Sequence, residues 1–513
     1  MLGFRSRQYK QVQFNQAFNQ AGSAEKRIFI PAPMGGENTS VPAHQLQPLY
    51  AEESNFIPTN RGLIAARDHK FRATYDGGAS QWNALIPFAG STSADSVLLG
   101  HIGTEIYNLT QYIDVVSASV SAGNEISVSA TSFPGGTDRY GYTEFNDSLI
   151  LVHDSASAVR YTTALGKFIP YSATASGDSI HNMWGINSFK RRLYAWPRTE
   201  PKFFYGSTDS TLGTLEPFSL GAVAPGSQHI TTFFGMTRDG GSGPDDFATF
   251  VMNDGKVVVY QGSDPGDANN WALVGTYQIG KPLGRRCAVA AGAEHYVMCN
   301  DDLYVLPRDL EGKRQQSNYI SRTRTAPNNF EIDGTYNNVT GNMFWEDENQ
   351  ALGVSVHLAG QPAFTVLADM DAVTTFLGRT FFSTQNGNDE PVLTEFNANA
   401  AGNVNQSALK TAPIPTNSRT NISLYNPLFD HTEGKKIKFK SRILYDYSAS
   451  ADWVTASASG DTTGIWMAGF GTGRAPQIEV VAISASVDAN TSASLSELVF
   501  RGIDLTITEN NGI

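Results

Sequence analysis

The sequence predicts an all-β protein: a β-propeller of about six blades, preceded by an extended N-terminal strap and followed by a C-terminal β-sandwich-like region. Two observations support this fold class. Charged residues make up only 17% of the chain, and 48 glycines, with many Ser, Thr and Asn residues, favour turns and strand edges over long helices. In addition, a hairpin-like pattern recurs through the middle of the chain.

The recurring pattern is a strand with alternating apolar residues, a short polar turn and a second strand that ends on an aromatic residue. Residues 145–161 (FNDSLILVHDSASAVRY) and 189–205 (FKRRLYAWPRTEPKFFY) each have seventeen residues, open with Phe and end with Tyr. Residues 377–396 repeat the pattern with a longer loop, and related segments span 98–109, 252–271 and 293–308. Such hairpins cannot bury their apolar faces alone, so the copies must pack together. Their spacing of roughly 40–60 residues is typical of propeller blades, and a sandwich of the same hairpins is the structural alternative.

Composition divides the chain into three segments. Residues 1–60 are predicted to be an arm and strap, because the first part is rich in Gln and Asn and the second carries many prolines. Residues 61–400 are predicted to form the propeller. Residues 401–513 begin with an Asn- and Ala-rich linker and continue as strands, which predicts a small β domain packed on the propeller.

The charge balance indicates which partners to expect. The net charge is −12 and the pI is about 5.3, which argues against a protein that neutralises nucleic-acid phosphates. An acidic surface repels DNA and would suit a protein that lets DNA slide past, although solubility explains the same charge. The sequence has no signal-peptide h-region and no stretch near the ~20 apolar residues of a membrane-spanning helix, so we expect no membrane segment and assembly in a cytoplasm.

The two cysteines are Cys287 and Cys299. A hairpin centred on Ala293 would place them opposite each other, so a disulfide is geometrically allowed. We expect free, buried thiols instead, because a cytoplasm keeps cysteines reduced.

One segment resembles a cation site. Residues 238–246 (RDGGSGPDD) contain a single GGxGxD, the core of a calcium-binding β-roll repeat. Asp239, Asp245 and Asp246 would be the oxygen ligands. Because β-roll sites need several stacked copies, we favour a tight glycine-rich loop, and we expect no metal or other cofactor.

Motifs for catalysis are absent from the sequence. It has no sialidase-type Ser-x-Asp-x-Gly-x-Thr-Trp box, no GxSxG, no GxxxxGK[ST] and no HExxH, and its nine histidines lack ligand spacing. We therefore predict a protein that is not an enzyme. A carboxylate pair for glycan cleavage remains an alternative, because propellers host such enzymes.

Two basic groups are candidate interface residues. Lys436, Lys438 and Lys440 alternate with apolar residues along a predicted strand. They either protect a sheet edge from unwanted pairing or face an acidic surface on a neighbouring subunit. Arg285 and Arg286 allow the same two interpretations, and arginines are well suited to carboxylates buried between subunits.

Several segments in a fixed order resemble one family, the tail nozzle or packaged-DNA stabilisation proteins of short-tailed bacteriophages. The first is residues 30–71, with a Pro-Ala-Pro-x-Gly-Gly opening followed by Asn-Phe-Ile-Pro. The second is residues 237–287, which contain GGSGPDD, VYQGSDP, WALVGTY and IGKPLGRR. The resemblance spans about 30–450 and is weakest in the last sixty residues.

The resemblance implies a non-enzymatic structural protein of the virion tail. It implies a β-propeller subunit of a hexameric ring that lies below the portal and adaptor, retains packaged DNA and lets it exit at infection. The expected partners are further copies of the chain, the adaptor and tail fibre or tailspike proteins, with double-stranded DNA enclosed but not bound specifically. A carbohydrate-binding or glycan-cleaving propeller at the tail tip and a host scaffolding propeller are the alternatives.

Overall fold

The fold was analysed in a computed structural model of the chain. The structure describes residues 25–35, 42–49, 51–54, 56–59, 62–64, 70–78, 82–121, 125–126, 139–239, 244–292, 294–301, 303–306, 310, 331–346, 350–355, 363–368, 372–386, 388–396, 407–414, 416, 419–430, 436–448, 451–459, 465–469, 471–486 and 499–510. Their regular structure is strand, apart from the 3-10 turns η2 (Ala43–Gln45), η3 (Thr110–Tyr112) and η4 (Ile180–Asn182). None of the helices in this part of the chain has the length and apolarity to cross a membrane.

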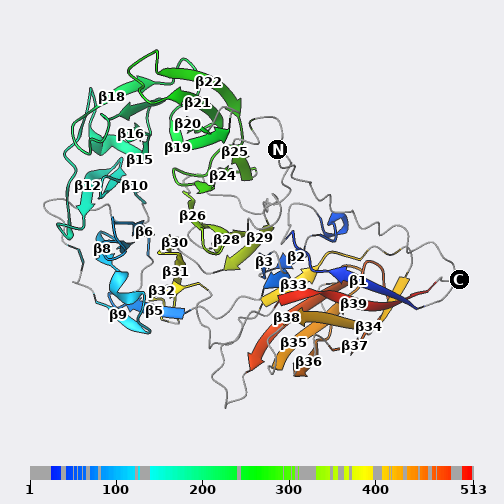
Figure 1. The fold of residues 1–513 in the computed structure, drawn as a ribbon. Coiled ribbons are helices and arrows are strands. Elements are labelled where there is room, and N and C mark those ends of the chain that lie inside the picture. Colours follow the sequence, from blue (N-terminus) through cyan, green and yellow to red (C-terminus); the bar gives the residue numbers. More distant parts are fainter. Residues whose placement is uncertain are drawn as a thin grey trace.

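Seven sheets form a ring, which Figure 1 shows face-on. We name them blades A to G in chain order. Blade A contains β6 (Ala84–Phe88), β7 (Val97–Ile102) and β8 (Glu105–Asn108). Blade B contains β10 (Gly141–Phe145), β11 (Ser148–His153), β12 (Ala156–Thr162) and β13 (Lys167–Pro170). Blade C contains β14 (Thr174–Ala175), β15 (Met183–Phe189), β16 (Arg192–Pro197), β17 (Lys202–Tyr205) and β18 (Thr214–Ser219).

The remaining four blades complete the circle. Blade D contains β19 (Ile230–Asp239), β20 (Pro244–Met252), β21 (Lys256–Gly262) and β22 (Trp271–Gln278). Blade E contains β23 (Ala288–Ala291), β24 (Glu294–Met298) and β25 (Leu303–Leu306). Blade F contains β26 (Asp333–Asn337), β27 (Asn342–Glu346), β28 (Gln350–Ser355) and β29 (Ala363–Ala368). Blade G contains β30 (Ala372–Phe376), β31 (Arg379–Gln385) and β32 (Pro391–Glu395), joined by β5 (Lys70–Tyr75) and β9 (Ala118–Val120).

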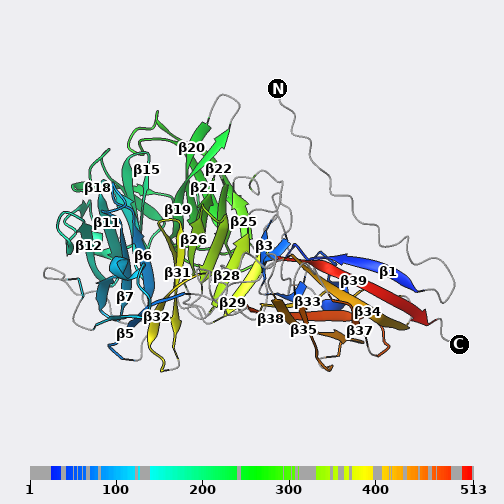
Figure 2. The same cartoon turned by 60° about the horizontal axis from the view of Figure 1, so that its bottom comes forward.

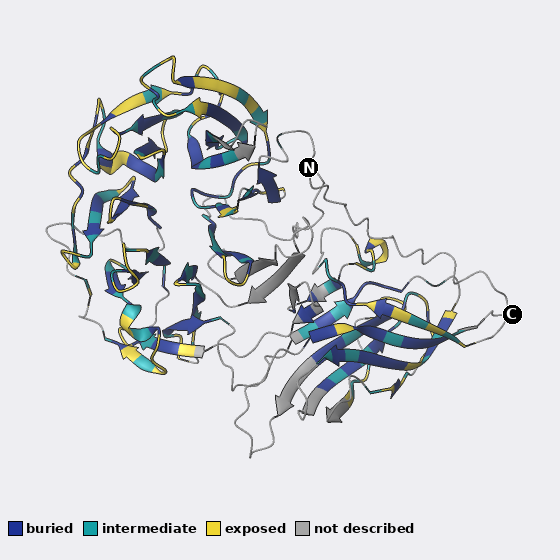
Figure 3. Ribbon diagram, in the orientation of Figure 1, coloured by how far each residue is buried: buried dark blue, intermediate teal, exposed yellow. Residues whose placement is uncertain are grey.

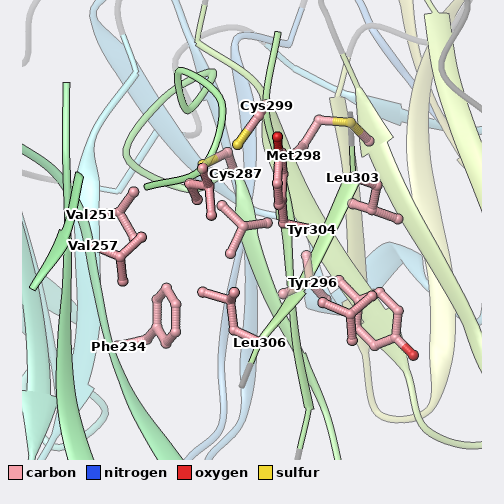
Figure 4. Close-up of a cluster of buried hydrophobic side chains, with 14 of the residues drawn as sticks. Phe234, Val251, Val257, Cys287, Tyr296, Met298, Cys299, Leu303, Tyr304 and Leu306 are labelled. Atoms are coloured by element: carbon pink, nitrogen blue, oxygen red, sulfur yellow. The ribbon is translucent and has the colours of Figure 1, made fainter. Parts of the chain in front are cut away.

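Hydrophobic packing between neighbouring blades holds the ring together. Every residue of β7 and of β11 is buried, because each of these strands lies within a blade that is covered on both faces. In Figure 3 the buried residues accordingly follow the inner parts of the blades. Blades D, E and F share one such cluster, shown in Figure 4, which includes Phe234, Val257 and Leu306.

Blade G closes the ring by joining two distant parts of the chain. β5 pairs antiparallel with β32, with Ala73 opposite Leu393. Arg72 of β5 donates from Nε to Glu395 at 2.8 Å, and Arg379 of β31 donates to the same carboxylate. β5, which precedes blade A in the chain, is therefore bound to the last blade by hydrogen bonds and ion pairs.

A separate β-sandwich lies beside the ring (Figures 1 and 2). One sheet contains β1 (Lys26–Pro31), β3 (Ile57–Thr59), β4 (Gly62–Ile64), β34 (Arg419–Asp430), β37 (Met467–Ala468) and β39 (Val499–Asn510). The other has the order β2 (Ala51–Ser54), β33 (Ser407–Thr411), β38 (Gln477–Ser486), β35 (Lys436–Leu444) and β36 (Val454–Ser459). Phe429, Phe439 and Phe500 pack together in the core between the sheets. β3 contacts β28 and β29, which joins the sandwich to blade F.

The all-β class and the propeller are confirmed, with two corrections. The ring has seven blades rather than six, because none of the predicted hairpin segments covers blade F. The described strands of the strap are also part of the C-terminal sandwich, since β1 pairs with β39 from Lys26↔Ile507 to Pro31↔Gly502. Most of the arm, residues 1–24, lies outside the described residues.

The cysteine prediction is half correct. Cys287 and Cys299 form no disulfide and are fully buried, as expected, and burial raises the pKa of the Cys287 thiol to about 12. They are not opposite each other, because the turn at Gly292 has a positive φ and sets the register Ala288↔Val297. Met298 therefore lies opposite Cys287 and donates its N–H to the Cys287 carbonyl at 3.1 Å. Figure 4 shows both thiols in the cluster between blades.

Candidate functional site: an ion cluster across the propeller axis

Six charged side chains from blades B, E and F meet near the axis of the propeller, and we call them the axial ion cluster. Its members are Arg139, Arg285, Arg286, Glu331, Asp333 and Glu346. Arg139 lies two residues before β10, and the arginine pair lies just before β23. The carboxylates come from the start of β26 and the end of β27. The first strands of blades B, E and F thus bring their charged ends to one place.

The central contact joins blade B to blade F. Arg139 donates from both terminal nitrogens to the Glu346 carboxylate, with Nη2···Oε2 at 2.9 Å. These side chains are 4% and 1% exposed. Two blades lie between B and F on one side of the ring and three on the other, so this pair bridges the axis itself. In Figure 1, β10 and β26 face each other across the centre.

Arg285 links three blades. Its Nε is 2.7 Å from Oε2 of Glu331, and its Nη1 donates to the carbonyl of Trp184 in blade C at 2.6 Å. Its Nη2 donates to the carbonyl of Arg139 in blade B. The Trp184 indole donates to the other oxygen of Glu331 at 2.9 Å, so both carboxylate oxygens are engaged.

Arg286 lies on an aromatic ring of blade B. Its guanidinium carbon is 3.5 Å from the centroid of Tyr142, and its Nη2 donates to the Tyr142 hydroxyl at 2.5 Å. Its Nε lies 2.7 Å from Asp333. Burial raises the pKa of Tyr142 above its usual range, which keeps this phenol neutral. Cation–π contact and ion pairing therefore act on the same guanidinium.

A small cavity of about 90 Å³ adjoins the cluster. Gly141, Gly185, Phe233 and both arginines of the pair are among its lining residues. A Cβ at Gly185 would come within 2.2 Å of the Trp196 ring, so only glycine allows this close approach. The cavity has room for a few water molecules and is well below the ~300–1,000 Å³ of small-molecule sites.

The charged groups of this cluster bind one another and so hold the blades together. Three guanidinium groups face three carboxylates, and each acid is bound by at least one arginine. The cluster does not contain two carboxylates on either side of an open cleft, the arrangement that glycan cleavage requires. Arg285 and Arg286 were candidate interface residues, and in this chain both bind carboxylates of the same subunit.

The other four members escaped the sequence analysis. Arg139, Glu331 and Asp333 each lie at or just before the first strand of a blade, the position that the arginine pair occupies in blade E. An alignment of the blades by their first strands would have shown charge recurring there. Glu346 carries no such signal, because it ends a second strand.

The predicted basic strand is β35, and it is not a sheet edge. β38 and β36 flank it over most of its length, so protection of an edge is not its role. The Lys440 ammonium and the Arg442 guanidinium lie 4.5 and 4.3 Å from the ring centroid of Trp453. Arg442 also pairs with Glu479 at 2.6 Å. The side chains of Lys436 and Lys438 lie outside the described residues.

The GGxGxD segment connects β19 and β20 in blade D. Asp246 accepts a hydrogen bond from Thr237 across the strand pair at 2.8 Å. The glycines 240–243 and the side chains of Asp239 and Asp245 lie outside the described residues. Within the part of the chain that the structure describes, no three His, Cys, Asp or Glu residues are grouped as a metal site.

Comparison with known proteins identifies no family for this chain. No protein-family model and no curated protein matches the chain. Among solved structures, the Cps50 (Swd1) β-propeller domain of Myceliophteria thermophila is 9% identical with a TM-score of 0.36, over 64% of this chain and 99% of that chain. The WD40 domain of SCAP from fission yeast is 9% identical with a TM-score of 0.29, over 72% and 94%. The designed protein Ika8 is 10% identical with a TM-score of 0.35, over 64% and 99%. These similarities are too weak to identify the fold by themselves. The sheet order and register of this chain identify it as a β-propeller with an attached β-sandwich.

Proposed function

We propose that this chain is a structural subunit of a phage tail nozzle. In this proposal about six copies form a ring below the portal and adaptor, and packaged DNA leaves the virion through the centre of the ring. The resemblance of residues 30–71 and 237–287 to the nozzle family motivates the proposal. Adaptor and tail fibre or tailspike proteins are the proposed neighbours in the tail.

The closed propeller axis is the observation that supports this role best. Arg139 and Glu346 are in direct contact across the axis, and both are almost fully buried. A DNA duplex, whose major groove alone is about 12 Å wide, has no path through such a propeller. If this protein surrounds DNA, each propeller is a solid wall element, and the conduit lies between copies. This is the arrangement that a ring of subunits provides.

Mass photometry and negative-stain microscopy of the purified full chain test the proposal. We expect a closed ring of about six copies with an opening between the propellers, either alone or with the adaptor. A chain that stays monomeric under virion-like conditions and does not bind the adaptor would refute it. Cleavage of a host glycan by the purified chain would favour the carbohydrate-active alternative.

A further inference from the structure

We propose that the lysine row of β35, defined as Lys436, Lys438 and Lys440, docks onto an acidic face of the propeller of the next copy in the ring. This inference rests on the proposed function, because it names the two surfaces that join neighbouring subunits. A ring needs such a pair, since head-to-tail contacts use two different patches on every subunit.

The first observation is a row of basic residues in β35 whose register partners in the sheet are all uncharged residues. The two other basic residues on neighbouring positions are matched: Lys410 pairs with Glu52 at 2.8 Å, and Arg442 pairs with Glu479. In contrast, the register partners of the lysine row are Ser457, Ser459, Ser484, Ser486, Thr455 and Val481. Three lysines therefore occupy alternate positions of β35, about 7 Å apart along the backbone, and none of their register partners is an acidic residue.

The second observation is a carboxylate at the same turn of each described blade. The turns between second and third strands all lie at one end of the propeller, because successive strands are antiparallel and the blades repeat. These turns or the residues directly flanking them carry an acid in six blades, and we call this set the acidic crown: Glu105, Asp154, Glu200, Asp254, Asp301 and Asp389. The corresponding turn of blade F, which lies outside the described residues, has Asp347 and Glu348 in its sequence.

Much of the crown is available for an external cation. Glu200 and Asp254 pair with Lys202 and Lys256. The other four acids have no lysine or arginine within ion-pair distance among the residues that the structure describes; only the imidazole of His153 lies near Asp154, at 3.5 Å. Three of the four come from the consecutive blades G, A and B, so they form an arc.

The distribution of charge along the chain agrees with this pairing. Residues 61–400 contain 35 acidic and 23 basic residues and so carry the whole net charge of −12. The flanking segments, which supply the sandwich, are nearly balanced. An acidic propeller and a sandwich with an unmatched lysine row are complementary between copies. DNA phosphates would also attract lysines, but they would leave the crown unpaired.

Charge reversal in the full chain tests the pairing. One variant carries Lys436→Glu, Lys438→Glu and Lys440→Glu, and a second reverses the acids of the arc with Glu105→Lys, Asp154→Lys and Asp389→Lys. We expect each variant alone to need at least tenfold more protein than the wild type to form rings, measured by mass photometry. An equimolar mixture should assemble again, because every contact then joins opposite charges. A single chain with all six changes should also assemble.

Several results would overturn the inference. If the lysine variant and the acid variant each form rings normally on their own, the inference is refuted and the proposed nozzle function is unaffected. A mixture and a six-change chain that both remain monomeric would also refute it. If the lysine variant assembles normally but loses affinity for a 30-base-pair duplex, the row is a DNA contact instead. A wild-type chain that never assembles refutes the proposed function, and this inference with it.

Two further measurements guard against misfolding of the charge-reversed chains. Thermal melts identify variants that are not folded, and Lys440→Gln with Asp389→Asn provides milder neutral forms. For the wild type, we expect assembly to weaken when salt rises from about 0.05 to about 0.5 M, because screening shortens the reach of exposed charges. Assembly that is insensitive to salt, together with normal assembly of the neutral forms, would contradict the proposed contact.

Discussion

At the scale of single residues, burial decides what each charged side chain does. Arg139 and Glu346 pair at 4% and 1% exposure, whereas the pair Arg191–Asp209 lies at 74% and 43%. The exposed pair is screened by water and contributes little. The buried pair has lost its hydration, so each member depends on the other.

Glu346→Gln should therefore be strongly destabilising. The substitution removes the carboxylate that binds both terminal nitrogens of the buried Arg139 guanidinium, while Asp333 stays at 3.8 Å from Nη1, and we expect a loss of about 3–5 kcal/mol in the free energy of unfolding. Urea unfolding followed by tryptophan fluorescence measures it. The matched control is Asp209→Asn, which breaks the exposed pair at a position of positive φ that Asn tolerates, and it should cost less than about 1 kcal/mol. Equal losses in the two variants would contradict this account of the axial ion cluster.

His295 should make stability depend on pH. It stacks on Phe234 with ring centroids 4.5 Å apart, and burial lowers its pKa to about 4. The unfolded chain binds this proton near pH 6.5, so stability is intact above pH 6.5 and falls as the pH drops toward 4. The loss is on the order of 3 kcal/mol for this group.

His295→Phe removes this titration and should flatten the pH profile. The new ring can keep the stack on Phe234, so the variant should be comparable to wild type at pH 7.5. The check is the urea midpoint of both proteins at pH 7.5 and pH 5. If the variant loses as much stability between the two pH values as the wild type, His295 is not the group responsible.

At the scale of elements, β5 has the largest effect for its length. Its six residues close a ring whose other strands come from 84 onward, through pairing with β32 and the shared contacts of Arg72 and Arg379 with Glu395. If β5 did not pair with β32, blade G would be open at that side. The ring is therefore closed by one hydrogen-bonded strand pair, β5 and β32.

Ala73→Pro tests the closure. Proline removes a backbone donor in the middle of a strand with neighbours on both sides, and we expect a loss of about 3 kcal/mol or more. Hydrogen exchange followed by mass spectrometry should show reduced protection in β30 to β32. The control is Phe71→Ala in the same strand, where the side chain is 59% exposed, and it should change protection little. Unchanged exchange in Ala73→Pro would mean that the ring does not depend on β5.

The elements also show how far the sequence could lead. Alternating apolar residues and polar turns predicted the hairpins β11–β12, β16–β17 and β31–β32. Each of these patterns lies within seventeen to twenty consecutive residues, so it can be recognised in the sequence. Blade F was missed because no predicted hairpin segment lies between residues 309 and 376. The Arg139–Glu346 contact spans 207 positions, and no local pattern encodes a pairing that only ring closure creates. The arginine pair could be noticed in the sequence, but its carboxylate partners within the chain could not be identified there.

At the scale of the whole molecule, the sandwich is built from both ends of the described chain. β39 has β34 on one side and β1 and β4 on the other. Ile30 of β1 is 6% exposed and belongs to the same core as Ile503 and Leu505. The N-terminal strap therefore stabilises strands that lie more than 450 residues away.

Deleting residues 1–34 should destabilise the sandwich and spare the propeller. The deletion uncovers the edge of β39 and removes the apolar surface of Ile30, which alone is worth about 2 kcal/mol. Hydrogen exchange should rise in β39 and β34 and stay unchanged in blades C and D. Deletion of residues 1–24, which leaves β1 in place, is the control. A sandwich that stays protected in the longer deletion would show that β1 is dispensable.

The path of the chain has a consequence for synthesis on the ribosome. The propeller is inserted between β4 and β33 of the sandwich, so all seven blades are translated before most of the sandwich exists. β39, which holds its sheet together, is translated last of all the described strands. A polypeptide that stops short of residue 499 would contain a complete propeller and an acidic crown but an unfinished sandwich. If the lysine row needs that sandwich to present it, such fragments could receive a neighbour but could not extend the ring.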